Sequence, residues 1–166
     1  MKTIALPRSL ESLVEFLNGL EERVPIDALR EHLSGLDVTP DDLTPFMQFG
    51  DTCYQRNLIC QGPWFELLCI CWRDGQSSVI HNHADSTCGL RIITGTAVET
   101  TFLPAGDHRV RPIASREFVE GQVCCTQDDD IHQVRNCQAD GSDLVTLHIY
   151  SPPLGEMQIW EDEPRD

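Results

Sequence analysis

Two histidines separated by one residue, His81 and His83, have the types and spacing that most directly indicate metal chemistry in this chain. Side chains alternate between the two faces of a β-strand, so residues at i and i+2 point to the same side. Two imidazoles on one face can bind one divalent metal, with a third ligand supplied from elsewhere in the chain. The competing interpretation is a histidine pair on a surface strand that binds no metal.

Glycines and a cysteine stand at fixed distances from this pair. Gly75 lies six residues before His81. Cys88 lies five residues after His83, and Gly95 lies seven after Cys88. This spacing resembles the first motif of the cupin superfamily, in which a glutamate ligand usually occupies the position of Cys88. The resemblance implies a small β-barrel with a metal site at its mouth.

A second and weaker match to the cupin motifs follows. Gly121 opens it, and His132 and Asn136 close it, while Gln127 and Asp129 replace the usual proline and glycine. The resemblance implies that His132 is the third ligand. Three neutral imidazoles leave the charge of a divalent ion uncompensated, so the centre would favour anionic ligands. The same donors suit zinc, and spacing alone does not choose iron.

Three polar residues share one face of a predicted strand near the end of the chain. Thr146, His148 and Tyr150 place a hydroxyl, an imidazole and a phenol in line. These groups can form a hydrogen-bonded chain that positions the phenol and tunes its proton. The alternative is an ordinary strand whose polar face meets solvent.

The composition argues against several classes of partner. The chain has 12 Lys and Arg residues against 27 Asp and Glu residues, a net charge of −15. Nucleic acids and anionic membrane surfaces bind basic patches, so neither is expected as a partner. The apolar runs are too short to span a bilayer, and the first residues lack the apolar length of a secretory signal. We therefore expect a cytoplasmic protein. As a separate prediction, we expect a monomer.

Eight cysteines are scattered along the chain without a C-x-x-C pair, which argues against a structural zinc site. Without an export signal, a disulfide framework is not expected either. Most of the cysteines should be small buried apolar residues. Cys69 and Cys71, in the apolar run 65–72, fit this role, and only Cys88 has a position that indicates another one.

The length predicts a single domain, 1–166. Within it we expect a helical part at 8–50, a β-barrel at 51–153 and a tail at 154–166. Ser9 is the expected cap of a first helix. A second helix is predicted at 26–33, and Thr39 followed by Pro40 marks a third. These helices should pack on the barrel and cover its edge.

Short strands separated by turn residues are predicted from Tyr54 onward, and this pattern is typical of a barrel or jelly roll. The fold class is therefore predicted as mainly β, a small cupin β-barrel with N-terminal helices packed on it. An acidic run at 128–130 reads as a solvated loop. The predicted strands are 54–59, 65–72, 79–83, 89–93, 96–103, 109–112, 117–119, 123–126, 132–136 and 144–150.

The chain also resembles the cysteine dioxygenases, iron enzymes of the cupin fold, most strongly at 54–58, 78–83, 132–136 and 147–153. The resemblance implies ferrous iron on three ligands and an oxidoreductase that adds both atoms of O2 to L-cysteine. The product would be cysteine sulfinate, a step of cysteine catabolism. The implied iron ligands are His81, His83 and His132.

The resemblance also implies a catalytic role for Tyr150, oriented by His148, and a thioether crosslink between Tyr150 and Cys88. Gly89 follows where a bulkier residue is common in animal enzymes. Thr146 replaces a usual serine but keeps the hydroxyl of the chain to His148. Trp72 is expected to pack beside the site.

Substrate choice rests on Arg56, because a guanidinium can clamp a carboxylate with paired charge-assisted hydrogen bonds. The resemblance implies that Tyr54 assists it. Related 3-mercaptopropionate dioxygenases carry glutamine at the position of Arg56 and an arginine near that of Met157. The alternative for Arg56 alone is a surface arginine on a strand.

Three other functions stay open. The first is a dioxygenase for 3-mercaptopropionate or another small thiol. The second is a metal-binding cupin without catalysis, such as a sensor. A zinc hydrolase is weaker, because no carboxylate base stands at an indicative spacing.

Overall fold

Helices come first and strands follow in this computed structural model, which describes residues 4–128 and 130–162. The helices are α1 (Arg8–Asn18), α2 (Ile26–Ser34), α3 (Pro40–Leu43) and the 3-10 helix η1 (Thr44–Phe46). The mainly β fold class with N-terminal helices is confirmed. The strands are β1 (Gln55–Gly62), β2 (Phe65–Trp72), β3 (Ile80–His81), β4 (Thr87–Thr94), β5 (Thr96–Gly106), β6 (Arg109–Val119), β7 (Val123–Gln127), β8 (Ile131–Asn136), β9 (Leu144–Ser151) and β10 (Ile159–Asp162).

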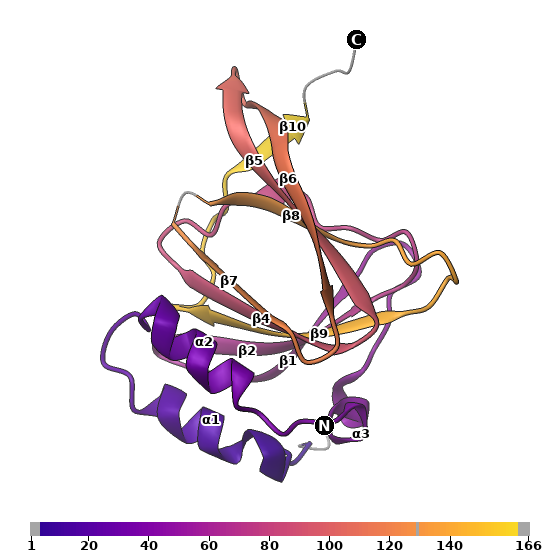
Figure 1. Cartoon of the computed structure of the whole chain (residues 1–166). Coiled ribbons are helices and arrows are strands. Elements are labelled where there is room, and N and C mark those ends of the chain that lie inside the picture. Colours follow the sequence, from indigo (N-terminus) through magenta and orange to yellow (C-terminus); the bar gives the residue numbers. More distant parts are fainter. Residues whose placement is uncertain (1–3, 129, 163–166) are drawn as a thin grey trace.

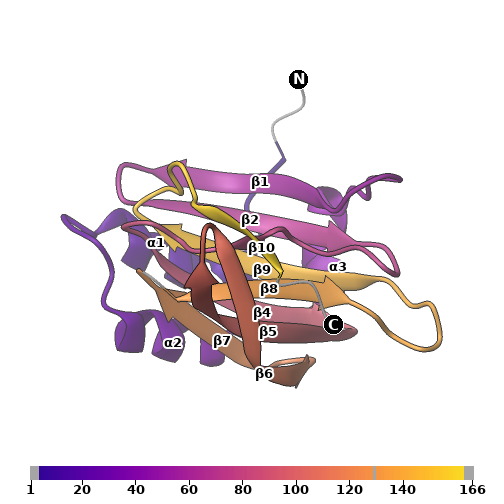
Figure 2. The ribbon, with the colours of Figure 1, turned by 90° about the horizontal axis from the view of Figure 1, so that it is seen from above.

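The strands form two layers that face each other (Figure 1). One layer is a five-stranded sheet in the order β1-β2-β9-β4-β7. The other five strands close on themselves in the order β10-β3-β8-β5-β6, because β10 pairs with β3 on one side and with β6 on the other. Seen from above, the strands of one layer lie over those of the other (Figure 2).

The helices cover the outer face of the five-stranded sheet (Figure 1), so the prediction that they pack on one face of the β-structure is confirmed, whereas they cover a face of the sheet and not its edge. Leu10, Leu13 and Leu17 are buried on one side of α1, at helical spacing. They belong to one apolar cluster with Leu29 and Leu33 of α2 and with residues of the sheet. Burial of this face, rather than helix propensity, stabilises such short helices.

Strand β2 is buried on both faces, which explains its continuous apolar sequence. Its residues alternate between two clusters. Cys69 and Cys71 face the cluster under the helices, as the sequence predicts. Ile70 and Trp72 face the cluster between the layers.

The glycines of the cupin spacing lie at backbone positions that favour glycine. Gly75, Gly95 and Gly121 have φ angles of 79°, 86° and 81°. Residues with a Cβ are rarely found there, because the side chain would crowd the backbone. At Gly95 a Cβ would also come within 2.9 Å of the Asp143 carbonyl oxygen.

Several predicted boundaries differ from the structure. Helix α1 begins at Arg8 with Pro7 as its N-cap, so the prediction of Ser9 as the cap was wrong. The predicted cap Thr39 is confirmed, because its hydroxyl accepts a hydrogen bond from the Asp42 backbone N–H. The strands predicted at 109–112 and 117–119 form one strand, β6, paired along its length with β5.

The tail predicted at 154–166 contains a strand, β10, although residues 163–166 lie outside the described part. In the acidic run, Asp128 pairs with Arg23, and Asp130 accepts a hydrogen bond from the Gln127 backbone. Asp129 lies outside the described residues. No helix among residues 4–128 and 130–162 has the length and apolar character needed to cross a membrane.

Candidate metal centre and adjoining cavity

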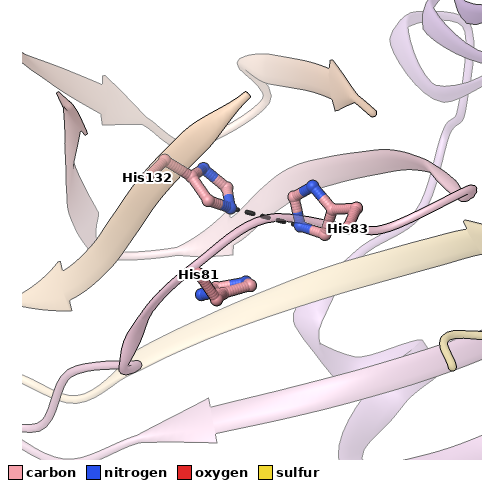
Figure 3. Close-up of side chains that lie close together, drawn as sticks. All are labelled: His81, His83 and His132. Atoms are coloured by element: carbon pink, nitrogen blue, oxygen red, sulfur yellow. Dashed lines mark hydrogen bonds between the residues drawn. The ribbon is translucent and has the colours of Figure 1, made fainter. Parts of the chain in front are cut away.

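Three buried imidazoles converge from two chain segments (Figure 3). Strand β3 supplies His81, the segment after it supplies His83, and β8 supplies His132. One nitrogen from each ring lies within 4.8 Å of the others, and the Nε2 atoms of His83 and His132 are 3.2 Å apart. The prediction that the first two share one strand face was wrong in detail, because β3 ends at His81. The convergence of the three imidazoles is nevertheless what the binding of a metal ion requires.

The outward-facing nitrogens of the first two rings have partners. The Nδ1 of His81 lies 2.8 Å from the Val79 carbonyl oxygen, and the Nδ1 of His83 lies 3.2 Å from the Thr126 hydroxyl. A ring whose Nδ1 is engaged in this way presents Nε2 to the centre. The set therefore offers nitrogen donors in fixed orientations.

Burial keeps these two imidazoles neutral. Burial, and secondly the charge of His132, lowers the pKa of His81 to about 4 and that of His83 to about 2. The lone pairs are thus free of protons near neutral pH, and a metal ligand needs such a lone pair. The donor set fits a divalent cation that accepts nitrogen ligands, which includes ferrous iron and zinc.

A buried glutamate supports the third ring, and the sequence did not single it out. The carboxylate of Glu99, on β5, lies 2.7 Å from the Nδ1 of His132. The Cys124 thiol, on β7, donates to the same carboxylate at 3.2 and 3.3 Å. Burial alone would raise the pKa of Glu99, but the hydrogen bond and charge of His132 outweigh it and hold that pKa below its usual value.

A small cavity adjoins the imidazoles and is lined from both layers. His81 and His132 line it, whereas His83 does not. The cavity also brings together the residues predicted to contact the substrate, Arg56 and Tyr54, with Met157 in the wall. The other predicted site residues in its wall are Trp72, Cys88, His148 and Tyr150.

The predicted hydrogen-bonded chain is present, and it is buried rather than facing solvent. The Trp72 indole N–H donates to the Thr146 hydroxyl at 2.9 Å. The His148 Nε2 lies 2.9 Å from the same hydroxyl, and its Nδ1 lies 3.3 Å from the Tyr150 hydroxyl. Burial, and secondly the nearby Cys88, raises the pKa of Tyr150, so its phenol keeps its proton near neutral pH.

The Arg56 guanidinium is held beside the cavity on two sides. Its Nη2 lies 3.2 Å from Oε1 of Glu66, and its Cζ lies 5.1 Å from the centroid of the Tyr150 ring. The same Glu66 oxygen accepts a hydrogen bond from the Leu154 backbone N–H. The side chain is 33% exposed, so the guanidinium is oriented by neighbours and not free in bulk water.

Cys88 and Tyr150 lie directly opposite each other on β4 and β9, and both are buried. Burial raises the pKa of the Cys88 thiol well above its usual value. Helix α2 packs behind this pair. A Cβ at Gly89 would come within 2.6 Å of Leu33 and 2.8 Å of Leu29, so a larger residue fits only if these leucine side chains move.

Fold and site together define a cupin whose three histidines could hold a metal ion. A Klebsiella pneumoniae protein with a double-stranded β-helix domain is similar in structure, with a TM-score of 0.59 and 12% identity, covering 72% of this chain and 94% of that one. A cupin domain from Schizosaccharomyces pombe is also similar, with a TM-score of 0.52 and 9% identity over 65% of this chain and 66% of that one. At these identities the likeness shows the fold.

The sequence comparisons are more specific. The family model of cysteine dioxygenase type I matches residues 1–163. Cysteine dioxygenase type 1 of Danio rerio is 30% identical over 165 residues, which cover 93% of this chain and 80% of that protein. The Rattus norvegicus protein of the same name is 31% identical over 154 residues, covering 89% and 76%. The chain belongs to the cysteine dioxygenase type I family.

Proposed function

We propose that this protein oxidises L-cysteine with O2 to cysteine sulfinate, using ferrous iron held by His81, His83 and His132. The single observation that supports this substrate best is the placement of Arg56 in the wall of the same cavity as two of the imidazoles. A small thiol acid needs a cation for its carboxylate and a metal for its thiol, and the cavity offers a place for each. Family membership supports the reaction.

In this proposal the Arg56 guanidinium binds the substrate carboxylate. Its contacts with Glu66 and the Tyr150 ring already restrict the Arg56 side chain, so less conformational entropy is lost when the substrate binds. Tyr54, whose ring stacks on Trp72 at 4.3 Å, lines the cavity beside it and would add a polar contact. Together these contacts fix the orientation of the substrate, which lowers the entropic cost of the reaction.

The three imidazoles would present Nε2 atoms to the iron, which when bound would supply the redox chemistry that joins O2 to a thiol. The protonated Tyr150 phenol, oriented through His148 and Thr146, would donate a hydrogen bond to reacting groups in the cavity. The buried setting strengthens that hydrogen bond, because little water competes for the donor.

We also propose the Cys88–Tyr150 thioether. Its formation removes one hydrogen from the thiol and one from the phenol ring, so it needs a two-electron oxidant such as O2. Their opposed positions on neighbouring strands support it. Mass spectrometry after reduction would find the peptides of these residues joined and two hydrogens lighter. Separate peptides from protein that has turned over cysteine would contradict the crosslink.

The function is tested by oxygen uptake with the purified protein, ferrous iron and cysteine, with the product identified by mass. We expect cysteine-dependent uptake and cysteine sulfinate. Faster turnover of 3-mercaptopropionate would contradict the role of Arg56. Bound metal without thiol-dependent uptake would indicate a non-catalytic cupin. The cytoplasmic location and monomeric state remain predictions, tested by cell fractionation and analytical ultracentrifugation.

A further inference from the structure

The three imidazoles differ in what holds their outer nitrogen. His81 faces a backbone carbonyl and His83 a hydroxyl, both uncharged. His132 instead faces the Glu99 carboxylate, at the shortest of the three distances, 2.7 Å. Among the described residues, this is the one charged partner of the group. The difference calls for a physical reason.

The carboxylate is placed by the register of two strands. Glu99 of β5 pairs with Val134 of β8, and Thr101 pairs with His132. Glu99 and His132 are therefore diagonal neighbours on one face, within reach of long side chains. Their contact is built into the pairing of β5 with β8 and does not depend on a mobile loop.

The carboxylate is also buried, with Glu99 only 8% exposed. An unpaired buried carboxylate is costly, so its oxygens need donors. His132 contacts Oε1, and the Cys124 thiol contacts Oε1 and Oε2. Strand β7 supplies both Cys124 and, two residues later on the same buried face, the Thr126 that contacts His83. One strand thus supports two ligands.

We propose that Glu99 is a positioning residue of the metal centre, which accepts the Nδ1–H of His132 and directs its Nε2 lone pair to the metal. It also adds a negative charge next to the three imidazoles, which stabilises a bound divalent cation. Cys124 in turn fixes the carboxylate. This inference rests on the proposed function only in assuming that the centre holds a metal.

The test is the metal affinity of the metal-free protein, titrated anaerobically with ferrous ion against a chromophoric chelator. Glu99→Gln keeps the size of the side chain and removes its charge. We expect affinity to fall about 10–100-fold, the usual effect of losing such a partner. Glu117→Gln is the matched control, because Glu117 is exposed on β6 and makes the same charge change. If Glu99→Gln, Glu117→Gln and the wild-type protein bind ferrous ion with equal affinity, the proposal is overturned.

A measurement on the unchanged protein covers the case in which Glu99→Gln does not fold. In the zinc-loaded protein, nitrogen NMR of the His132 ring should show the proton on Nδ1, exchanging slowly with water. A proton on Nε2, or metal bound at Nδ1, would overturn the proposal. Both measurements omit cysteine and O2. A protein that binds metal in this way but does not oxidise cysteine would refute the proposed function and leave this inference standing.

Discussion

Thr146 joins two buried polar side chains, and Thr146→Val would remove that connection with little change in shape. The threonine is fully buried, and its hydroxyl is 2.9 Å from both the Trp72 Nε1 and the His148 Nε2. Trp72 and His148 are themselves only 2% and 4% exposed. Water therefore has little access to replace the lost hydroxyl.

The expected cost follows from the two groups left without a partner. Each unsatisfied buried polar group costs about 1–3 kcal/mol, so Thr146→Val should lower the free energy of unfolding by about 2–6 kcal/mol. Thr146→Ser is the matched control, because it keeps the hydroxyl and loses one methyl group, at a cost of about 1 kcal/mol. A typical domain is stable by only about 5–15 kcal/mol, so the difference is large enough to measure.

The assay is urea unfolding of the metal-free protein, followed by tryptophan fluorescence. A valine variant as stable as the serine variant, within about 0.5 kcal/mol, would refute the assignment of Thr146 as the shared partner. In the metal-loaded enzyme the valine variant should also lose more turnover than the serine variant. The reason is that Tyr150 contacts His148, which would no longer be fixed by Thr146.

Three further predictions test the substrate clamp, the buried imidazoles and the packing of α2. Arg56→Gln should raise KM for cysteine about 10–100-fold, because charge-assisted hydrogen bonds contribute about 1.5–3 kcal/mol; steady-state kinetics with an unchanged KM would contradict the clamp. In the folded, metal-free chain, burial is the main cause that lowers the pKa of His81 from 6.5 to about 4 and that of His83 to about 2. Below pH 6.5 the unfolded chain therefore binds protons that the folded chain does not. The free energy of unfolding should therefore be unaffected by these two histidines above pH 6.5. As the pH falls below 6.5, it should decrease by up to about 1.4 kcal/mol per pH unit for each histidine. A free energy of unfolding, measured with urea, that does not decline between pH 6.5 and 5 would contradict this prediction. Gly89→Ala should cost about 1–3 kcal/mol by overpacking, measured by thermal or urea unfolding against Gly155→Ala, where a Cβ meets nothing within 4 Å; equal stability of the two variants would contradict it.

Much of the fold was accessible from local sequence patterns. Strand β2 was predicted with the observed bounds, because a short run of mainly apolar residues between turn residues is typical of a buried strand. Strand β10 was missed, because Ile159–Asp162 has no pattern of its own. It becomes a strand only by pairing with β3 and β6, and the sequence of a segment does not indicate such contacts with distant segments.

The same distinction applies to the site. The histidine spacing and the alternation of Thr146 and His148 are local, and they identified groups that the structure brings into contact. Glu99 has no such spacing, since its relation to His132 depends on the register of two strands far apart in the chain. An acidic residue within a predicted strand was the available indication. Glu66 was missed for the same reason, because it becomes relevant only through its contact with Arg56.

The arrangement of the layers bears on substrate choice. The imidazoles that line the cavity belong to the barrel layer, whereas Arg56 and Tyr150 belong to the five-stranded sheet. In the proposed function, the thiol and the carboxylate of the substrate therefore contact different layers. Packed sheets lie about 10 Å apart, with a spacing fixed by the side chains between them. Ile70 from the sheet and Val134 from the barrel line the cavity and also belong to the core cluster between the layers. The packing that stabilises the fold thus also sets the length of thiol acid that reaches both ends of the site.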